Sequence, residues 1–492
     1  MRNGARCGST LRGRGDSPTA HRYRRCMTVD LRPFLDLDAC VEQLRGLIRI
    51  PSVNPPDGGP DVAAGRDPSG GEAAAALYCA EVMAGDGIES EVIELTPGRG
   101  SCFARLRADG PTTEPPLILL SHIDVVPVDA ESWSRDPFGG ELIDGVVWGR
   151  GAVDMKNMVA MELGVMLALK RSGAELRRDI IFAAVADEEA GGEHGARGLV
   201  ERRPELFGDP NGRPAAAAIN EVGGYSMTIG GRRFYAIQVA EKGIVWTRLR
   251  TTGTPGHGSM PHPDNAAIKL AAAVTALAAD QAARPARVLP VVAGFLGAMG
   301  LAGVAEMAEA DPVGASALMA QLVTDPVMRR SLDAMLRDTV TPNVLRAGKK
   351  VNVVPGAGEA EVDVRTLPGT DQAALLAHLQ AVVGDEATVE AVVTLPAVEW
   401  PHDAEIVGYM HDALRAADPE ATSVPMMITP GTDAKALSQL DIPCYGFAPL
   451  RLEPDVPFLS LFHGHDERVQ VSALEFGLPV LADVVARYAT RS

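Results

Sequence analysis

The 492-residue chain lacks several features that define common protein classes. No run of 18 or more consecutive apolar residues is present, so the sequence offers no membrane span of the usual kind. Positive charge is scarce: 46 lysines and arginines are outnumbered by 64 aspartates and glutamates, which gives a net charge of −18. No basic patch with interleaved aromatic residues offsets this charge, which argues against nucleic-acid binding.

Paired cysteine spacing is also missing. The six cysteines, at positions 7, 26, 40, 79, 102 and 444, are scattered. They indicate free thiols and a cytoplasmic location, not a disulfide framework or a cysteine-type zinc site. Residues 1–26 contain seven arginines and no apolar centre of the kind that a secretory signal needs. We expect this segment to be a disordered leader or a mis-annotated start, with Met27 the natural first residue.

The first informative motif is an apolar segment that ends in a histidine. Residues 117–123 read Leu-Ile-Leu-Leu-Ser-His-Ile, which is typical of a buried parallel strand. His122 and Asp124 are two residues apart at its end, so their side chains leave the same face. This arrangement suits a metal-bound imidazole whose second nitrogen contacts a carboxylate. Taken alone, the pair is more typical of a hydrogen-bonded histidine at a strand end.

Four further segments carry acidic or histidine side chains, and two of them are strand-like runs that end in such residues. They are the glycine-rich turn 149–156 with Asp154, the strand-like run 180–186 followed by Glu188 and Glu189, the run 215–219 followed by Asn220 and Glu221, and the segment 462–467 with His463 and His465. Open α/β sheets place their ligands at such strand ends. Two imidazoles with four or five carboxylates match what two borderline-hard metal ions require.

In this order the motifs resemble a known family. Ser-His-Ile-Asp-Val-Val-Pro, Gly-Arg-Gly-Ala-Val-Asp-Met-Lys, Asp-Glu-Glu-Ala-Gly-Gly and His-Gly-His-Asp-Glu are similar to those of co-catalytic di-zinc hydrolases such as aminoacylases, glutamate carboxypeptidases, carnosine dipeptidases and succinyl-diaminopimelate desuccinylases. The resemblance extends from about Leu44 to Ala489. It implies a zinc-peptidase-like three-layer α/β/α catalytic domain with an inserted ferredoxin-like α+β lid domain, which also forms a homodimer.

The resemblance also implies roles for individual residues. Two Zn²⁺ ions, for which Co²⁺ or Mn²⁺ are possible substitutes, would be held by His122, Asp154, Glu189, Glu221 and His463, with Asp154 bridging both. Asp124 would orient His122, and Glu188 would act as general base toward the attacking water. His465 would be a neighbour of the site. The Asp154–Met155 peptide bond would be cis. Relatives often have Asp at the position of Asn220, which bears on the assignment of Glu221.

Residue patterns in the interior suggest where the inserted domain lies. Strand-like and helix-like segments between 233 and 397 follow a strand–helix–strand–strand–helix–strand order, which fits a ferredoxin-like sandwich. The catalytic domain would then consist of residues 27–232 and 398–492. An Ala/Met/Leu-rich stretch, about 285–345, predicts an additional helical insertion whose default role is buried packing.

Four positions would contact the substrate, and His257 would complete the site. By resemblance, Asn352, Arg365, Gly431 and Thr432 would hold a substrate carboxylate, which a guanidinium fits bidentately. His257 would stabilise the tetrahedral oxyanion across the dimer interface. The sequence therefore predicts a metal-dependent enzyme that cleaves an amide beside a free carboxylate in a small molecule, either an N-acyl amino acid or a dipeptide. The alternatives are a non-catalytic metal-binding homologue and an aminopeptidase of the same fold.

Overall fold

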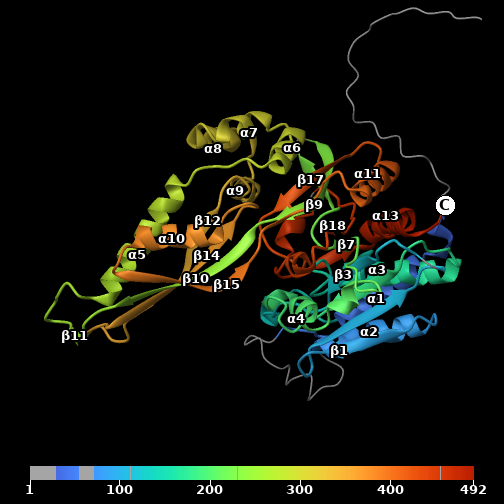
Figure 1. Ribbon diagram of the computed structural model, residues 1–492, viewed down its shortest axis with the longest axis horizontal. Coiled ribbons are helices and arrows are strands. Elements are labelled where there is room, and N and C mark those ends of the chain that lie inside the picture. Colours follow the sequence, from blue (N-terminus) through green and yellow to red (C-terminus); the bar gives the residue numbers. More distant parts are fainter. Residues whose placement is uncertain (1–28, 55–70, 111, 230, 455, 492) are drawn as a thin grey trace, which may run out of the picture.

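A ten-stranded mixed sheet, parallel at its centre from β6 to β18, forms the middle of the computed structural model, which describes residues 29–54, 71–110, 112–229, 231–454 and 456–491 (Figure 1). The predictions for residues 1–26 lie outside the described residues. The strands run in the order β1-β2-β6-β3-β7-β18-β9-β16, and β17 and β8 also pair with β9. Their bounds are β1 Ser90–Glu94, β2 Gly100–Leu106, β3 Leu117–His122, β6 Ile180–Val185, β7 Ala217–Asn220, β8 Ser226–Ile229, β9 Arg232–Glu241, β16 Val398–Glu399, β17 Thr422–Ile428 and β18 Cys444–Gly446.

Helices cover both faces of this sheet. In β3 every residue is buried, and alternate side chains face opposite sides: Leu119 belongs to one apolar core and Leu120 to another. The first core includes residues of α1 Leu37–Ile48, α2 Gly71–Ala84, α3 Lys156–Ser172, α11 Glu405–Ala417 and α13 Val471–Ala489. The second core includes residues of α4 Ala196–Arg202 and α12 Ala434–Leu437. The predicted three-layer arrangement is confirmed.

A second, four-stranded antiparallel sheet follows β9. Its order is β12-β14-β10-β15, with α5 Ala266–Ala283 and α10 Gln372–Val383 packed on one face. The strands are β10 Gly243–Thr252, β12 Thr339–Ala347, β14 Ala357–Thr366 and β15 Ala387–Leu395. This is the predicted ferredoxin-like order. A short pair, β11 Gly256–His257 with β13 Val353–Val354, extends from it at the end remote from the large sheet (Figure 1).

Two details of the predicted inserted segment differ in the structure. Residues 233–241 were assigned to the inserted domain, but β9 hydrogen-bonds to strands of the large sheet, and the small sheet begins at Gly243. The end of the stretch 285–345 was expected to be helical, yet from Thr339 it forms β12. β12 is an edge strand with mostly exposed or half-buried side chains, so it lacks the apolar run that would reveal it.

The rest of that stretch is helical, as predicted. It forms α6 Pro290–Ala298, α7 Ala302–Ala308, α8 Pro312–Leu322 and α9 Pro326–Ala334. Although these helices lie within the small-sheet segment of the sequence, their buried residues belong to the same core as the large sheet. Figure 1 shows α6, α7 and α8 together beside β17.

Helix α5 is, among the described residues, the one helix long and apolar enough to cross a membrane by length and composition. It packs on the small sheet through Leu270 and Leu277, which belong to that sheet's core. The four cysteines in the described part of the chain are buried and unpaired, as expected. A small three-stranded sheet joins β4 Glu141–Ile143, β5 Val146–Trp148 and β19 Arg468–Gln470, and so ties the C-terminal segment to the residues before α3.

Candidate metal centre and substrate cavity

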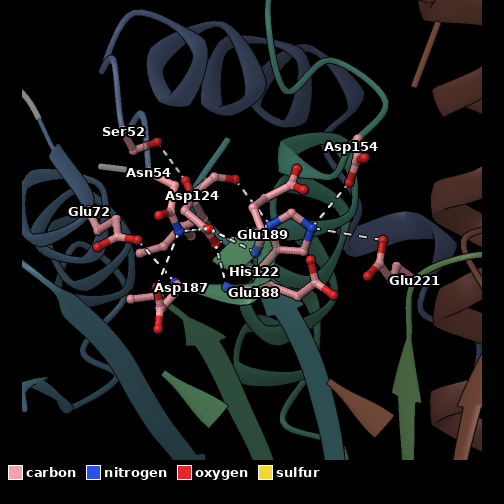
Figure 2. Close-up of polar contacts among 12 residues, drawn as sticks. Ser52, Asn54, Glu72, His122, Asp124, Asp154, Asp187, Glu188, Glu189 and Glu221 are labelled. Atoms are coloured by element: carbon pink, nitrogen blue, oxygen red, sulfur yellow. Dashed lines mark hydrogen bonds and ion pairs between the residues drawn. The ribbon is translucent and has the colours of Figure 1, made fainter. Parts of the chain in front are cut away.

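The predicted site residues follow three adjacent strands of the large sheet. β6, β3 and β7 are parallel neighbours, so their carboxyl ends meet at one edge. His122 ends β3, Glu188 and Glu189 follow β6, and Glu221 directly follows β7. Figure 2 shows these side chains converging with Asp154. The expectation that the strand ends gather the acidic and histidine residues is therefore met by the geometry.

Five of these side chains form two groups with the geometry of metal ligands. His122, Asp154 and Glu221 make one group, and Asp154, Glu189 and His463 make the other; within each, the ligand atoms lie within 4.8 Å of one another. His122 Nε2 lies 3.1 Å from Asp154 Oδ1 and 3.8 Å from Glu221 Oε2. His463 Nε2 lies 3.3 Å from Asp154 Oδ2 and 3.1 Å from Glu189 Oε2. Asp154 thus shares its two oxygens between the groups.

Asp124 holds several parts of the centre at once. His122 Nδ1 lies 3.4 Å from its carboxylate and 3.0 Å from its backbone oxygen. The same carboxylate accepts hydrogen bonds from the backbone N–H groups of Glu188 and Glu189, both at 3.1 Å, and from Asn54 Nδ2 at 2.8 Å (Figure 2). Asp124 is fully buried. It therefore orients both the imidazole and the turn that carries the two glutamates.

The charges of the centre favour a bound cation. Burial, together with the nearby carboxylate of Glu221, raises the pKa of Glu188 well above its ordinary value. Burial raises the pKa of Glu189 to about 7, and contacts with Asp154 and Glu189 raise the pKa of His463 to about 10. Buried carboxylates that are costly to ionise, and an imidazole whose charged form they stabilise, both favour positive charge at this place. Nitrogen and oxygen donors in two groups that share one carboxylate fit a pair of metal ions.

The turn that carries Asp154 is held by Glu467. Its buried carboxylate accepts the backbone N–H groups of Gly151, Val153 and Asp154 at 3.0, 2.8 and 3.1 Å, and pairs with Arg150 at 2.6 Å. The Asp154–Met155 peptide bond that follows is cis, as predicted. Glu467 is the last residue of the His-Gly-His-Asp-Glu motif, but the sequence analysis predicted no role for it. Its place in that motif is the sequence feature that could have identified it.

Replacing Glu467 with glutamine is expected to weaken metal binding. The amide cannot accept all four hydrogen bonds, so the Asp154 carboxylate would be less firmly placed. Loss of such a supporting contact typically costs about 10–100-fold in metal affinity. Competition with a chelator measures this affinity, and Glu475→Gln on exposed α13 surface is the matched control. Equal affinities for the two variants would show that Glu467 does not position the ligand turn.

A second buried network of ion pairs and hydrogen bonds was also not predicted from the sequence. Asp187 adopts a left-handed backbone (φ 69°), and its carboxylate pairs with Arg99 at 2.5 Å. Arg99 also pairs with the buried Glu72, which accepts the backbone N–H of Asp187 at 3.0 Å. These contacts fix the chain just before Glu188. The partners are 27 to 115 residues apart in the sequence, so no local spacing could have revealed them.

A cavity of about 550 Å³ opens beside the metal centre. Its lining includes Asp154, Glu188 and His463, together with the predicted substrate residues Arg365, Gly431 and Thr432. Arg365 lines the cavity and donates from Nε and Nη2 to the two carboxylate oxygens of Asp363, at 2.7 and 3.2 Å, so one edge of its guanidinium is already paired. Volumes of this size suit small-molecule ligands.

The contacts of Thr432 differ from those that the sequence analysis predicted. Its backbone N–H and its hydroxyl both donate to the buried carboxylate of Glu241, at 3.1 and 2.5 Å. The hydroxyl and N–H that were expected to meet a substrate carboxylate are thus already engaged. Lys435, one turn further, pairs with the same Glu241 at 3.2 Å and donates to the backbone oxygen of Lys242 at 2.6 Å. Thr432 therefore shapes the turn through Glu241.

His257 and Asn352 are not brought to this cavity within one chain. His257 lies in β11 and Asn352 precedes β13, at the outer end of the small sheet, and neither lines the cavity. Gly258 N donates to Asn352 O at 2.8 Å, so the two residues do lie close to each other. His257 is exposed, with Nδ1 2.8 Å from Ser259 Oγ. His465 is also exposed and belongs to neither ligand group.

Fold and site together define a class. A parallel-rich sheet whose strand ends carry two ligand groups, with a further glutamate beside them at the end of a cavity, is the arrangement of a metal-dependent hydrolase. The chain belongs to the peptidase family M20/M25/M40, whose model matches residues 118–487.

The chain is also similar to individual members of related protein groups. N-fatty-acyl-amino acid synthase/hydrolase PM20D1 of Xenopus tropicalis is 28% identical over 458 residues, covering 88% of this chain and 83% of that protein. Aminoacylase-1 of Sus scrofa is 28% identical over 415 residues, covering 82% and 87%. Among solved structures, the metallo-carboxypeptidase Sso-CP2 of Sulfolobus solfataricus matches with a TM-score of 0.64 at 18% identity, covering 91% of this chain and 99% of that one. A dinuclear metal-binding peptidase of Bacillus subtilis matches with a TM-score of 0.57 at 16% identity, covering 93% and 98%.

Proposed function

We propose that the protein hydrolyses the amide bond of small molecules that carry a free carboxylate beside that bond, such as N-acyl amino acids or dipeptides. The observation that carries the proposal is the sharing of Asp154 between two ligand groups, with Glu188 beside them at the end of a cavity. The relatives named as an aminoacylase and an N-fatty-acyl-amino acid hydrolase support this substrate class.

Two metal ions would be held by five residues. His122, Asp154 and Glu221 would bind one, and Asp154, Glu189 and His463 the other. Zinc suits these donors, as do cobalt and manganese. Bound there, a metal pair supplies Lewis acidity, which activates water and polarises the substrate carbonyl.

Glu188 would move the proton. It belongs to neither ligand group, lines the cavity, and has its backbone held by Asp124. A carboxylate in this position takes a proton from the attacking water and returns it to the leaving nitrogen. Adjacent Glu189 can serve as a ligand because the two side chains point in different directions from the 3₁₀ turn Glu188–Ala190 (Figure 2).

Arg365 would bind the substrate carboxylate. Arg365 lies on β14 of the small sheet and lines the same cavity as Asp154, Glu188 and His463. An arginine fork matches a carboxylate in shape and charge, and Gly431 would let the substrate approach the backbone. A strict aminopeptidase would recognise a free amine instead, and a non-catalytic homologue would have no need of Glu188. The cationic wall and the retained glutamate favour the carboxylate-directed hydrolase.

A homodimer through the small-sheet domain would complete the site. His257 lies far from the cavity of its own chain, so it could contact a substrate only at a partner's site. Exposed apolar side chains accompany it: Met260 is 66% exposed and Val353 is 46% exposed. Such side chains near a functional residue are typical of an interface.

A substrate screen tests the proposal directly. We expect the zinc-loaded protein to hydrolyse N-acyl amino acids or dipeptides and to leave the corresponding amides, whose carboxylate is blocked, nearly untouched. Release of free amino acid is the measurement, with metal-free protein as the control. Equal rates with blocked and free carboxylates, or hydrolysis of amino-acid anilides alone, would contradict it.

A further inference from the structure

The cavity beside the metal centre has apolar walls away from the ligand groups. Side chains of the helical insertion supply one of these walls: Phe295 from α6, and Met328, Leu332 and Met335 from α9 and its end. Trp246 of the small sheet faces the same space and is 44% exposed. The insertion thus forms part of the substrate cavity, which buried packing alone does not explain.

Packing places the insertion against the large sheet. α6 packs on β17, and Phe295 and Leu296 belong to the same core as Met426 and Ile428 of that strand. Ile428 precedes the turn that contains Gly431, and both residues line the cavity, so the insertion packs next to this turn. The wall is therefore built on the catalytic sheet, even though its sequence interrupts the small-sheet domain.

A buried lysine fixes the end of the insertion. Lys242, between β9 and β10, donates from Nζ to the backbone oxygens of Ala334 and Arg337 at 3.0 and 2.8 Å and lies 3.2 Å from Thr339 Oγ1. These acceptors flank Met335, which lines the cavity. Lys242 also connects the two sheets, so the wall is held at the junction between them. A wall fixed in this way is suited to select the size of a bound group.

We propose that the helical insertion, residues 290–335, forms a specificity wall for an extended apolar group of the amide substrate. The group is either a medium or long acyl chain or a large apolar side chain. This inference rests on the proposed function. Methionine side chains on the wall are flexible and polarisable, which suits chains of varied shape. Each buried methylene contributes about 0.8 kcal/mol, or roughly fourfold in affinity.

Two substrate series separate the sources of the apolar group. In the first, glycine carries acetyl, butanoyl, octanoyl or dodecanoyl groups; in the second, N-acetyl is kept while the amino acid changes from glycine to leucine and phenylalanine. We expect kcat/KM to rise at least about tenfold from the smallest to the preferred member of one series. The series in which it rises identifies the group. Flat profiles in both would overturn the inference and leave the proposed function standing.

A pair of tryptophan variants tests the wall itself. Ser331 is half-buried and lines the cavity, whereas neighbouring Arg330 is exposed and does not. Ser331→Trp is expected to lower kcat/KM for the preferred large substrate by at least about tenfold and to leave the smallest substrate within about threefold. Arg330→Trp should change neither. If Ser331→Trp lowered both substrates equally, the insertion would not select substrate size.

Binding measurements keep the inference testable without turnover. Met328→Ala removes wall contacts at a half-buried position and serves as a second variant in case Ser331→Trp does not fold. Calorimetric titration of the metal-loaded Glu188→Gln protein with N-octanoylglycine, N-acetylphenylalanine and N-acetylglycine gives the Kd of each large ligand relative to that of the smallest. Met328→Ala in that background should reduce the preference for the favoured large ligand by about threefold or more. If no amide were hydrolysed, the proposed function would fail, yet a preference for either large ligand that depends on Met328 would still support the wall. A lack of preference for both large ligands would refute it.

Discussion

Replacing Glu188 with alanine is expected to lower turnover by at least about 10²–10⁴-fold, the contribution of a positioned general base. The metals should stay bound, because Glu188 belongs to neither ligand group. Loss of the side chain removes the cavity-lining carboxylate that is proposed to accept the proton and return it. Metal analysis and kcat, measured on the same preparation with the best substrate of the screen, decide the outcome.

The control for this variant lies five residues away. Glu193→Ala removes an exposed carboxylate of the same loop, which lies 3.5 Å from Arg197 at the surface. It should retain normal turnover and metal content. Near-normal turnover of fully loaded Glu188→Ala protein would remove Glu188 from the mechanism. Loss of metal from that variant would instead make Glu188 a ligand, and the division of labour with Glu189 would have to be reversed.

The large sheet and the candidate ligand residues at its edge were predictable because their signals are local. β3, β6 and β7 are fully buried on both faces, so each is a short apolar run with a polar residue at its end. Parallel strands bring their carboxyl ends to one edge of a sheet. The sequence therefore predicts that His122, Glu189 and Glu221 are neighbours. Asp154 and His463 came from motif resemblance, and the structure places them in the same cluster.

The supporting contacts could not be predicted, because they join segments far apart in the chain. Glu467 contacts a turn more than 300 residues away, and the engagement of Thr432 by Glu241 spans 191 residues. No periodicity marks such pairs. The helical insertion is a related case: its composition predicted helices, but only tertiary packing shows that they share the core of the large sheet and line the cavity.

His257 is a predicted site residue that lies at the outer end of the small sheet and does not line the cavity of its own chain. Replacing it with alanine is expected to lower kcat by about 10²–10³-fold, the usual cost of one lost oxyanion donor. Metal content and oligomeric mass should not change, since the exposed side chain contacts neither ligand group. His378→Ala removes another exposed histidine of the same domain and should leave kcat unaffected.

Subunit exchange shows whether His257 acts on a partner's site. Glu188→Ala and His257→Ala are each expected to be inactive, but a heterodimer combines intact Glu188 of one subunit with intact His257 of the other at one of its two sites. Equal mixing should therefore restore up to about a quarter of wild-type activity in a symmetric dimer. Mass analysis must confirm that exchange occurred. If heterodimers form and activity stays absent, His257 does not work across the interface, and the oxyanion contact must come from residues around the chain's own cavity.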